Sequence, residues 1–313
     1  MIRNHFFSTA KSLVYSTGLL IFLNSCNSVD NPLAYQKDTH GRGKTSVFIE
    51  ESFKKLFQTS IYTFESQYPK AKIVASYYSE SAIIDSFYKN KTKTIVISRD
   101  FTVIEKETLK KKKVEVRSDK IAIDAIALIV HPSNKDTLLT VNELKQILIG
   151  QQQLWNSSSK KINIVYDHIN SANYNYIKSF CGKENTNNNV FAVKSNEEVI
   201  NYVKNHPNAM GVIGLNWISD LQDFDVKDFL AGIKVVAIAK DKKSDYFLPY
   251  ASFIYTKEYP LIRDVWMINK ASKSGLNTGF VLFMMSEIGQ TIVQRAGILP
   301  ANSPVRLIQF TSE

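Results

Sequence analysis

Near its start the chain repeats one order of segments three times: an apolar strand-like run, a short polar turn and an amphipathic helix. The apolar runs cover residues 46–49, 72–78 and 94–97, and residues with helical apolar spacing follow each one. A strand that alternates with a helix is typical of an α/β sheet with largely parallel strands. The repeated order therefore predicts an α/β fold.

The third of these units carries the strongest hint of chemistry. Its strand, residues 94–97, ends on Ser98 and Arg99, and the pattern Thr-Val-Ile-Glu at 102–105 predicts a capped helix directly afterwards. The open edge of an α/β sheet is where ligands usually bind, and a hydroxyl and a guanidinium both favour anions. The alternative is that Arg99 is an ordinary exposed residue after a strand.

The rest of the chain continues the α/β pattern. Residues 121–130 are almost all apolar and often β-branched, which predicts a strand buried on both faces. Further strands are expected at 161–167, 210–215, 232–239, 250–255 and 261–268. Helices are expected at 141–148, 172–181, 196–205 and, as one long closing helix, 277–296.

The first 25 residues have the features of an export signal. Positive charge at Arg3 and Lys11 precedes an apolar run at 13–23, which is too short for a settled membrane span. The run ends in Leu-Asn-Ser followed by Cys26, which resembles a bacterial lipobox with Cys26 as the lipidated residue. The alternative is an uncleaved anchor. Residues 26–45 are polar and aperiodic, as expected of a flexible tether.

Composition describes an ordinary globular protein and excludes several classes of site. The 313 residues carry a formal charge of +10, which suits an acidic partner without choosing among nucleic acid, a membrane or a small anion. Cys181 has no partner for a disulfide in the mature protein, and no Cys or His pair has the spacing of a metal site. We therefore expect no metal and no cofactor.

Four polar turns lead from a strand into a helix, at residues 50–53, 79–81, 98–100 and 170–173. Each helix start offers free backbone N–H groups and the positive end of the helix dipole. Several such starts around one cleft could hold a tetrahedral oxyanion. The simpler alternative for each turn alone is that Ser, Asn and Asp are good helix caps.

The sequence resembles the phosphate-binding proteins of ABC transporters, the PstS-like group of type 2 periplasmic-binding proteins. The resemblance rests on Glu-Glu-Ser-Phe at 50–53, Ile-Ser-Arg-Asp-Phe-Thr at 97–102, Gly-Gln at 289–290 and Ala-Gly-Ile-Leu-Pro at 296–300. It covers about residue 45 to the C-terminus and implies two lobes, each a mixed sheet flanked by helices. Lobe I would comprise residues 46–124 and 244–313, and lobe II residues 125–243.

The resemblance also implies a ligand site between the lobes. The positions that match the family's ligand-binding turns are Glu51, Ser52, Phe53, Ser79, Ser81, Ser98, Arg99, Ser171 and Asn173. The match departs at 170–174, where Asn-Ser-Ala-Asn-Tyr replaces the family's Gly-Ser-Gly-Thr and its usual Arg. Losing that Arg removes a charge-assisted contact worth about 1.5–3 kcal/mol, so we expect binding to depend more on Arg99.

Glu50 and Glu51 bear on which anion would bind. Phosphate near neutral pH keeps a proton that a carboxylate can accept, whereas sulfate has none and would be repelled. If either side chain enters the cleft, phosphate gains over sulfate. The alternative is that both face solvent and favour the helix dipole.

The leading hypothesis is a lipid-anchored solute-binding protein on the periplasmic face of a bacterial membrane. It would act as a monomer, capture phosphate or a similar oxyanion, and deliver it to an ABC transporter permease. The alternative keeps the fold but makes the chain an interaction or sensory lipoprotein with a degenerate cleft. An enzyme is less favoured because no nucleophile or phosphate-loop motif is present, and the export signal argues against nucleic-acid binding.

Overall fold

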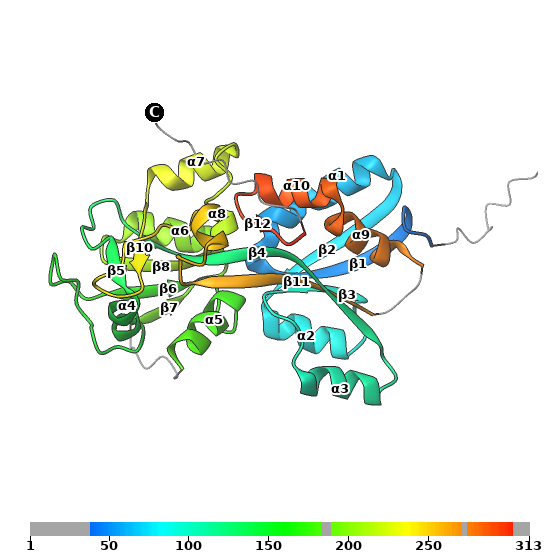
Figure 1. Cartoon of the computed structure of the whole chain (residues 1–313), viewed down its shortest axis with the longest axis horizontal. Coiled ribbons are helices and arrows are strands. Elements are labelled where there is room, and N and C mark those ends of the chain that lie inside the picture. The colour runs from blue at the N-terminus through cyan, green and yellow to red at the C-terminus, as the bar shows by residue number, and fades with distance from the viewer. Residues whose placement is uncertain (1–37, 183–188, 271–273, 303–313) are drawn as a thin grey trace, which may run out of the picture. The chain divides into compact units, whose positions relative to one another are not determined.

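A computed structural model describes residues 38–182, 189–270 and 274–302 of the chain (Figure 1). The expected signal peptide at 1–25, the lipidation site Cys26 and the tether up to residue 37 lie outside the described residues. Within them, no helix is long and apolar enough to cross a membrane.

The strands follow one another through most of the described chain. In chain order they are β1 (Arg42–Glu50), β2 (Lys70–Tyr78), β3 (Thr94–Ile97), β4 (Val116–Val130), β5 (Leu138–Thr140), β6 (Asn163–Tyr166), β7 (Val190–Ala192), β8 (Ala209–Gly214), β9 (Lys234–Val235), β10 (Ala237–Ala239), β11 (Ile262–Lys270) and β12 (Leu299–Pro300).

Helices separate most of these strands. They are η1 (Glu51–Phe53), α1 (Lys54–Gln67), α2 (Glu80–Tyr88), α3 (Val103–Lys111), α4 (Val141–Leu148), α5 (Ala172–Cys181), α6 (Asn196–Asn205), η2 (Leu215–Trp217), α7 (Phe224–Ala231), α8 (Ala251–Tyr255), α9 (Leu276–Met285) and α10 (Glu287–Arg295).

One mixed sheet organises the described residues, with its main strands in the order β2-β1-β3-β11-β4-β8-β6-β7. β1 pairs in parallel with β2 and β3, and β6 pairs in parallel with β7 and β8, whereas β11 and β4 are antiparallel to their neighbours. A small parallel pair, β10-β5, stands apart. The mixture of parallel βαβ units and antiparallel connections confirms the expected α/β class.

β4 divides the sheet into two halves. Its residues 116–125 pair with β11, and its residues 126–130 pair with β8. We call the strands β2, β1, β3 and β11 the β1 half, and β8, β6 and β7 the β6 half. The expected boundary between the lobes, at residue 124, falls inside β4, where the strand leaves one half for the other.

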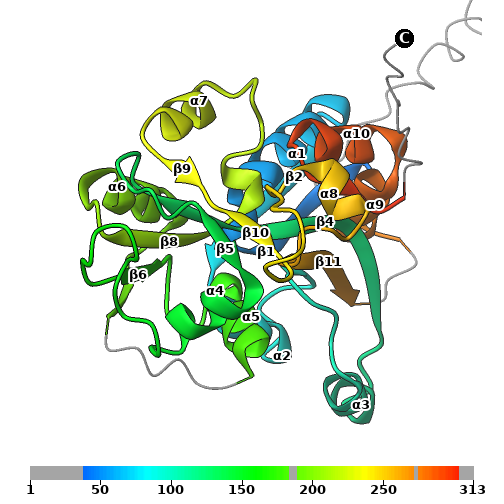
Figure 2. The ribbon, with the colours of Figure 1, turned by 60° about the vertical axis from the view of Figure 1, so that its left-hand side comes forward.

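Helices cover both faces of each half. Figures 1 and 2 show α1, α9 and α10 on one face of the β1 half and α2 and α3 on the opposite face. α6 packs on β8 and β6, with α5 also against β8. Strands covered on both faces must be apolar throughout, and Ala125 to Val130 of β4 are indeed fully buried.

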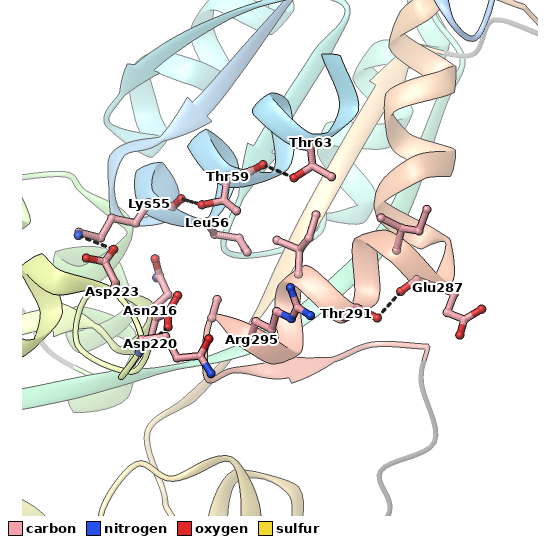
Figure 3. A pocket seen from close by; sticks show the side chains of 14 residues that line it. Lys55, Leu56, Thr59, Thr63, Asn216, Asp220, Asp223, Glu287, Thr291 and Arg295 are labelled. Carbon is pink, nitrogen blue, oxygen red and sulfur yellow. Dashed lines mark hydrogen bonds and ion pairs between the residues drawn. The ribbon is translucent and has the colours of Figure 1, made fainter. Parts of the chain in front are cut away.

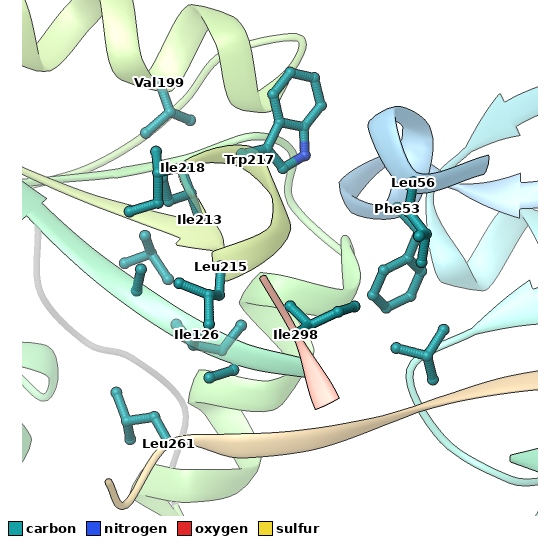
Figure 4. Packing of buried hydrophobic residues seen from close by; sticks show 14 of the residues in the cluster. Phe53, Leu56, Ile126, Val199, Ile213, Leu215, Trp217, Ile218, Leu261 and Ile298 are labelled. Carbon is teal, nitrogen blue, oxygen red and sulfur yellow. The ribbon is translucent and has the colours of Figure 1, made fainter. Parts of the chain in front are cut away.

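The main apolar core contains residues from both halves of the sheet. Phe53 and Leu56, at the start of the first helical segment, pack in one cluster with Leu215 and Trp217 after β8 and with Ile298 (Figure 4). Burying a side chain as large as that of Phe53 contributes about 1.5–3 kcal/mol. The same buried residues therefore hold the start of α1 next to the end of β8.

β1 begins earlier than the sequence predicts. It starts at Arg42, which pairs with Lys70, so residues 42–45 are strand rather than the end of the tether. Most of this end of the strand is only partly buried, so polar residues are tolerated there. The apolar pattern that marks a strand is therefore missing. The pairing extends the sheet toward the N-terminal end of the described chain.

Two predictions near the C-terminal end are wrong. Residues 251–255 form α8 rather than a strand: Ile254 is buried, whereas Tyr250 and Tyr255 are exposed, so aromatic content misleads where only one side packs. The expected helix 277–296 breaks at Ser286, whose extended backbone and hydroxyl, which accepts a hydrogen bond from Gly289 N, start α10.

The run 232–239 divides between two sheets. β9 pairs with β4, β10 pairs with β5, and Val236 lies between them. Helix α7 and the short strands β5 and β7 were not expected, because each is brief and its apolar pattern is incomplete. Asp223, which accepts hydrogen bonds at the start of α7, is the signal that could have revealed that helix.

Candidate functional site

A cavity of about 270 Å³ opens where strands of both halves end. Glu50 is the last residue of β1, Tyr78 is the last of β2, and Asp167 follows β6 directly. Ligands of open α/β sheets bind at the carboxyl ends of such strands. We call this cavity the acidic cavity; its lining comprises Glu50, Glu51, Tyr77, Tyr78, Ser79, Ala82, Asp167, His168, Ser171 and Lys194.

The carboxylate of Glu50 joins two helix starts in different halves. Its Oε2 accepts hydrogen bonds from Ser52 N, at 3.0 Å, and from the Ser52 hydroxyl, while its Oε1 accepts one from Ala172 N at 3.2 Å. Ser52 belongs to η1, which leads into α1, and Ala172 is the first residue of α5. Glu50 is fully buried, so these protein donors replace the water that a carboxylate normally binds.

Glu51 and Asp167 form a second group of acceptors beside Glu50. Glu51 Oε2 accepts hydrogen bonds from the backbone N–H of Asn196, at 3.3 Å, and from its side-chain amide. The carboxylate of Asp167 accepts from Ser171 Oγ at 2.7 Å and from the amides of Asn173 and Asn196, both at 3.2 Å. The start of α6 is thereby held against the end of β1.

Burial disfavours ionisation of all three carboxyl groups, and for the two glutamates the nearby Asp167 adds to it. Burial, with the carboxylate of Asp167 as the next cause, raises the pKa of Glu50 to about 8, against the opposing charge of Arg263. Burial and Asp167 also raise the pKa of Glu51 to about 7. Burial raises the pKa of Asp167 as well, although hydrogen bonds from Ser171 and Asn173 oppose it. Glu50 and Glu51 therefore ionise near neutral pH rather than near pH 4.5.

Arg263 of β11 lies behind the acidic cavity. Its guanidinium is buried against Asp124, with Nη2 at 2.7 Å from Oδ2, and reaches Asn173 Oδ1 at 2.8 Å and Ser52 Oγ at 3.1 Å. The cation also lies 4.8 Å from the centre of the Phe53 ring. One buried Arg therefore contacts residues from both helix starts that hold Glu50.

The structure brings together only part of the site expected from the sequence. Glu51, Ser79 and Ser171 line the acidic cavity. Ser52 and Asn173 lie just behind the lining, bonded to its carboxylates. The question left open by the sequence is answered for both glutamates, since Glu50 and Glu51 enter the cleft rather than facing solvent.

The remaining expected residues do not line the cavity. Phe53 is buried in the core, and Ser81 is exposed on α2. Ser98 donates from its N–H and its hydroxyl to Glu80, at 3.1 and 2.7 Å. Arg99 makes a paired contact with Glu105, at 2.8 and 2.9 Å. The hydroxyl and guanidinium at the end of β3 are therefore occupied by carboxylates of the chain itself.

Sequence reasoning missed several residues that the structure gathers here. Asp167 precedes the recognised turn at 168–171, and Asn196 follows Ser195 in the cap of α6, so their positions at element ends were the available signal. His168, directly after Asp167, and Lys194, just before the cap of α6, also line the cavity. Arg263 lies inside β11, where no local pattern marks it.

A second cavity, of about 400 Å³, lies between α1, α10 and the segment that follows η2 (Figure 3). Lys55 bonds there to Asp223 at 3.1 Å and to Asp225 at 3.2 Å, and Arg295 enters from α10. Its lining contains cations, anions and threonine hydroxyls in mixture, and it shares no residue with the acidic cavity. In the described ranges, no group of three His, Cys, Asp or Glu residues could hold a metal ion.

Comparison with known proteins gives one family match and one curated relative. A family model described as a PBP superfamily domain matches residues 36–287. The phosphate-binding protein PstS of Borreliella burgdorferi is 27% identical to this chain over 240 residues, which cover 73% of this chain and 79% of that protein.

Solved structures share the arrangement of strands and helices. A proposed phosphate ABC transporter substrate-binding protein of Clostridium perfringens, with phosphate bound, aligns at a TM-score of 0.69 with 21% identity, covering 83% of this chain and 100% of that one. An ABC-type phosphate transport receptor of Vibrio cholerae aligns at 0.62 with 19% identity, covering 82% and 100%. The fold class expected from the sequence, a mixed sheet flanked by helices as in type 2 periplasmic-binding proteins, is thereby confirmed.

Proposed function

The chain belongs to the PBP superfamily, and from this premise we propose that it is a solute-binding lipoprotein that captures phosphate or a similar oxyanion for an ABC transporter. The anion would bind between the two lobes and hold them closed until delivery to the permease. We propose no enzymatic role. The names of the curated relative and of the solved neighbours support phosphate as the first ligand to test.

One observation carries this proposal: N–H donors from both halves converge on a single carboxylate. A carboxylate is itself an oxyanion, and Glu50 receives Ser52 N from the β1 half and Ala172 N from the β6 half. The donors that hold it are of the kind that a phosphate or sulfate oxygen needs. Donors in opposite halves would make ligand binding and lobe closure one event.

We propose a ligand site at this point, built from part of the set expected from the sequence. Ser52 and Phe53 would supply the start of the first helical segment, and Ser171 and Asn173 the start of α5, with Ser79 at the rim. Above about pH 7, where Glu51 is ionised, its carboxylate would accept a hydrogen bond from the proton that phosphate retains. Ser81, Ser98 and Arg99 would contribute only after a rearrangement of their present contacts.

Calorimetric titration of the full chain with phosphate, and separately with sulfate, tests the proposal. We expect a binding heat with phosphate at pH 5.5 to 7. At pH 8 to 8.5, where Glu51 is ionised, sulfate should bind more weakly than phosphate because sulfate has no proton to donate to Glu51. The exposed Glu107→Gln, on α3, is the matched control and should bind as the parent does. No heat with either anion at any pH from 5.5 to 8.5 would refute the proposal.

The lipid anchor is a separate part of the proposal and has its own test. We propose that Cys26 carries the lipid and places the monomeric domain at the periplasmic face of the membrane. In detergent phase partitioning, the parent should enter the detergent phase and Cys26→Ser should stay in the aqueous phase. Cys181→Ser, which removes the other cysteine, should partition like the parent. Equal partitioning of the parent and Cys26→Ser would exclude the anchor.

A further inference from the structure

The donors proposed to bind ligand are already bonded to carboxylates of the chain. Glu50 accepts hydrogen bonds from Ser52 N, next to the β1 half, and from Ala172 N, next to the β6 half. Glu51 occupies the N–H of Asn196 at the start of α6. Each of these helices or helical segments presents N-terminal N–H groups to a carboxyl oxygen, and in each case the acceptor is a glutamate side chain.

The end of β3 repeats the same arrangement outside the acidic cavity. Glu80, which is 4% exposed, accepts both the N–H and the hydroxyl of Ser98 and lies 3.5 Å from Arg99 Nε. The Ser98 hydroxyl and the Arg99 guanidinium, which the sequence suggested as donors to an anion, therefore also contact a carboxylate of the chain itself. At both positions, glutamates of the chain accept the hydrogen bonds.

We propose that Glu50 is a built-in competitor of the ligand, whose carboxylate holds the cleft closed on itself and must leave its two N–H donors before an oxyanion can bind. This inference rests on the proposed function and deepens it. It makes Glu50 a residue that sets affinity and pH dependence rather than one that contributes directly to capture.

The charges around Glu50 explain why an incoming anion would not displace it freely. The groups that face it are Glu51 on its own segment, Asp124 of β4, Asp167 and His168 after β6, Lys194 before α6, and Arg263 of β11. Arg263 is already paired with Asp124, and Lys194 is exposed. Once Glu50, Glu51 and Asp167 are ionised, the acidic groups therefore dominate, and an incoming anion meets charges of its own sign.

Protonation provides a route by which the competition can weaken. A neutral carboxyl binds N–H donors less strongly than a carboxylate does, and it removes one like charge from the cavity. Burial and Asp167 raise the pKa of Glu50 to about 8, so this change falls near neutral pH. Affinity for an oxyanion should therefore rise as the pH falls from 8.5 to 5.5.

Three chains test the proposal by calorimetry at pH 5.5 and 8.5: the parent, Glu50→Ala and Glu50→Gln, with Glu107→Gln as the exposed control. Phosphate and sulfate are both titrated, because sulfate does not change protonation in this range. At pH 8.5 Glu50→Ala should bind phosphate at least about tenfold more tightly than the parent, and Glu50→Gln should fall between them. Sulfate affinity should depend on pH less in both variants than in the parent.

A measurement without ligand tests the internal contact separately. Hydrogen exchange at the amide of Ala172 reports the bond to Glu50 Oε1. Exchange there should be at least about tenfold faster in Glu50→Ala than in the parent and unchanged in Glu107→Gln. Glu50→Gln keeps the shape of the side chain but weakens the acceptor, so an exchange rate at Ala172 above that of the parent still tests the contact if Glu50→Ala folds poorly.

The outcomes separate this inference from the proposed function. Tight phosphate binding by the parent that neither Glu50 variant improves would overturn the inference alone. Unchanged exchange at Ala172 in Glu50→Ala would also overturn it. No binding of either anion by any of the chains would overturn the proposed function, and the competition with it.

Discussion

Arg263 and Asp124 form a buried ion pair at the crossing of the two halves of the sheet. Arg263 Nη2 lies 2.7 Å and Nε 3.0 Å from Asp124 Oδ2, and the two side chains are 1% and 0% exposed. The same guanidinium donates hydrogen bonds to Ser52, at the start of the first helical segment, and to Asn173, at the start of α5. A pair buried this completely is costly to break, because the remaining charge is left without a partner.

Arg263→Met should therefore destabilise the chain by about 3–5 kcal/mol. The methionine fills much of the volume but leaves the carboxylate of Asp124 buried and unpaired. Urea unfolding of the full chain measures the loss. Arg295→Met, at an exposed position on α10, is the matched control and should change the unfolding free energy by less than about 0.5 kcal/mol. A loss below about 1 kcal/mol for Arg263→Met would contradict the role of the pair.

Stability should fall as the pH rises from about 5 to above 8. Glu50 has an ordinary pKa of 4.5 and a folded pKa of about 8, so between these values the folded chain keeps a proton that the unfolded chain has released. Raising the pH then favours unfolding, with a slope of at most about 1.4 kcal/mol per pH unit for one group. Glu51, whose pKa rises to about 7, adds an effect of the same sign.

Urea unfolding at pH 5.5 and 8.5 checks this pH dependence. Glu50→Gln removes the titrating group, so its unfolding free energy should drop less between the two values than that of the parent does. Glu107→Gln, on the exposed face of α3, should follow the parent. Parallel changes in the parent and Glu50→Gln would contradict the raised pKa.

Arg99→Ala should change phosphate affinity by less than about threefold, which corresponds to under about 1 kcal/mol. From the sequence, Arg99 was expected to dominate binding, but its guanidinium is held by Glu105 and its side chain is 39% exposed. Calorimetry decides between the two expectations, with Lys106→Ala, a neighbouring exposed cation, as the control. Loss of binding in Arg99→Ala alone would show that Arg99 leaves Glu105 to reach the ligand.

Ser171→Ala should weaken both the fold and ligand binding, whereas Ser195→Ala should weaken only the fold. Each hydroxyl caps a helix, by accepting from Tyr174 N in one case and Glu198 N in the other, both at 3.2 Å. Losing such a cap costs about 0.5–2 kcal/mol. Only Ser171 also lines the acidic cavity and bonds to Asp167. Equal phosphate affinities for the two variants would remove Ser171 from the site.

Local patterns were enough to predict much of the fold. The capped helix start expected at 102–105 is confirmed, and the expected helix at 141–148 begins with a capping box at Thr140; both reciprocal hydrogen bonds are present in each. The continuously apolar run at 121–130 is confirmed as the buried part of β4. The prediction of short elements was wrong where packing outweighed propensity. In α8, for example, the single buried residue, Ile254, leaves almost no periodicity to detect.

The site was harder to predict because its contacts join distant parts of the chain. The turn at 50–53 was marked as a candidate, but which residues its acids would meet depends on Ala172 and Asn196, more than 100 positions away. Arg263 gave no signal, since an arginine within a strand is usually a surface residue. The sequence located the helix starts, whereas only the fold shows that glutamates occupy them.

The passage of β4 through both halves also bears on how the chain unfolds. Residues 116–125 and 126–130 form one uninterrupted strand, and the buried cluster beneath it contains residues from both halves. Melting either half would strip hydrogen-bonding partners from a strand that the other half still needs. The described domain should therefore lose structure as one cooperative unit, giving a single calorimetric transition despite its division around a cleft.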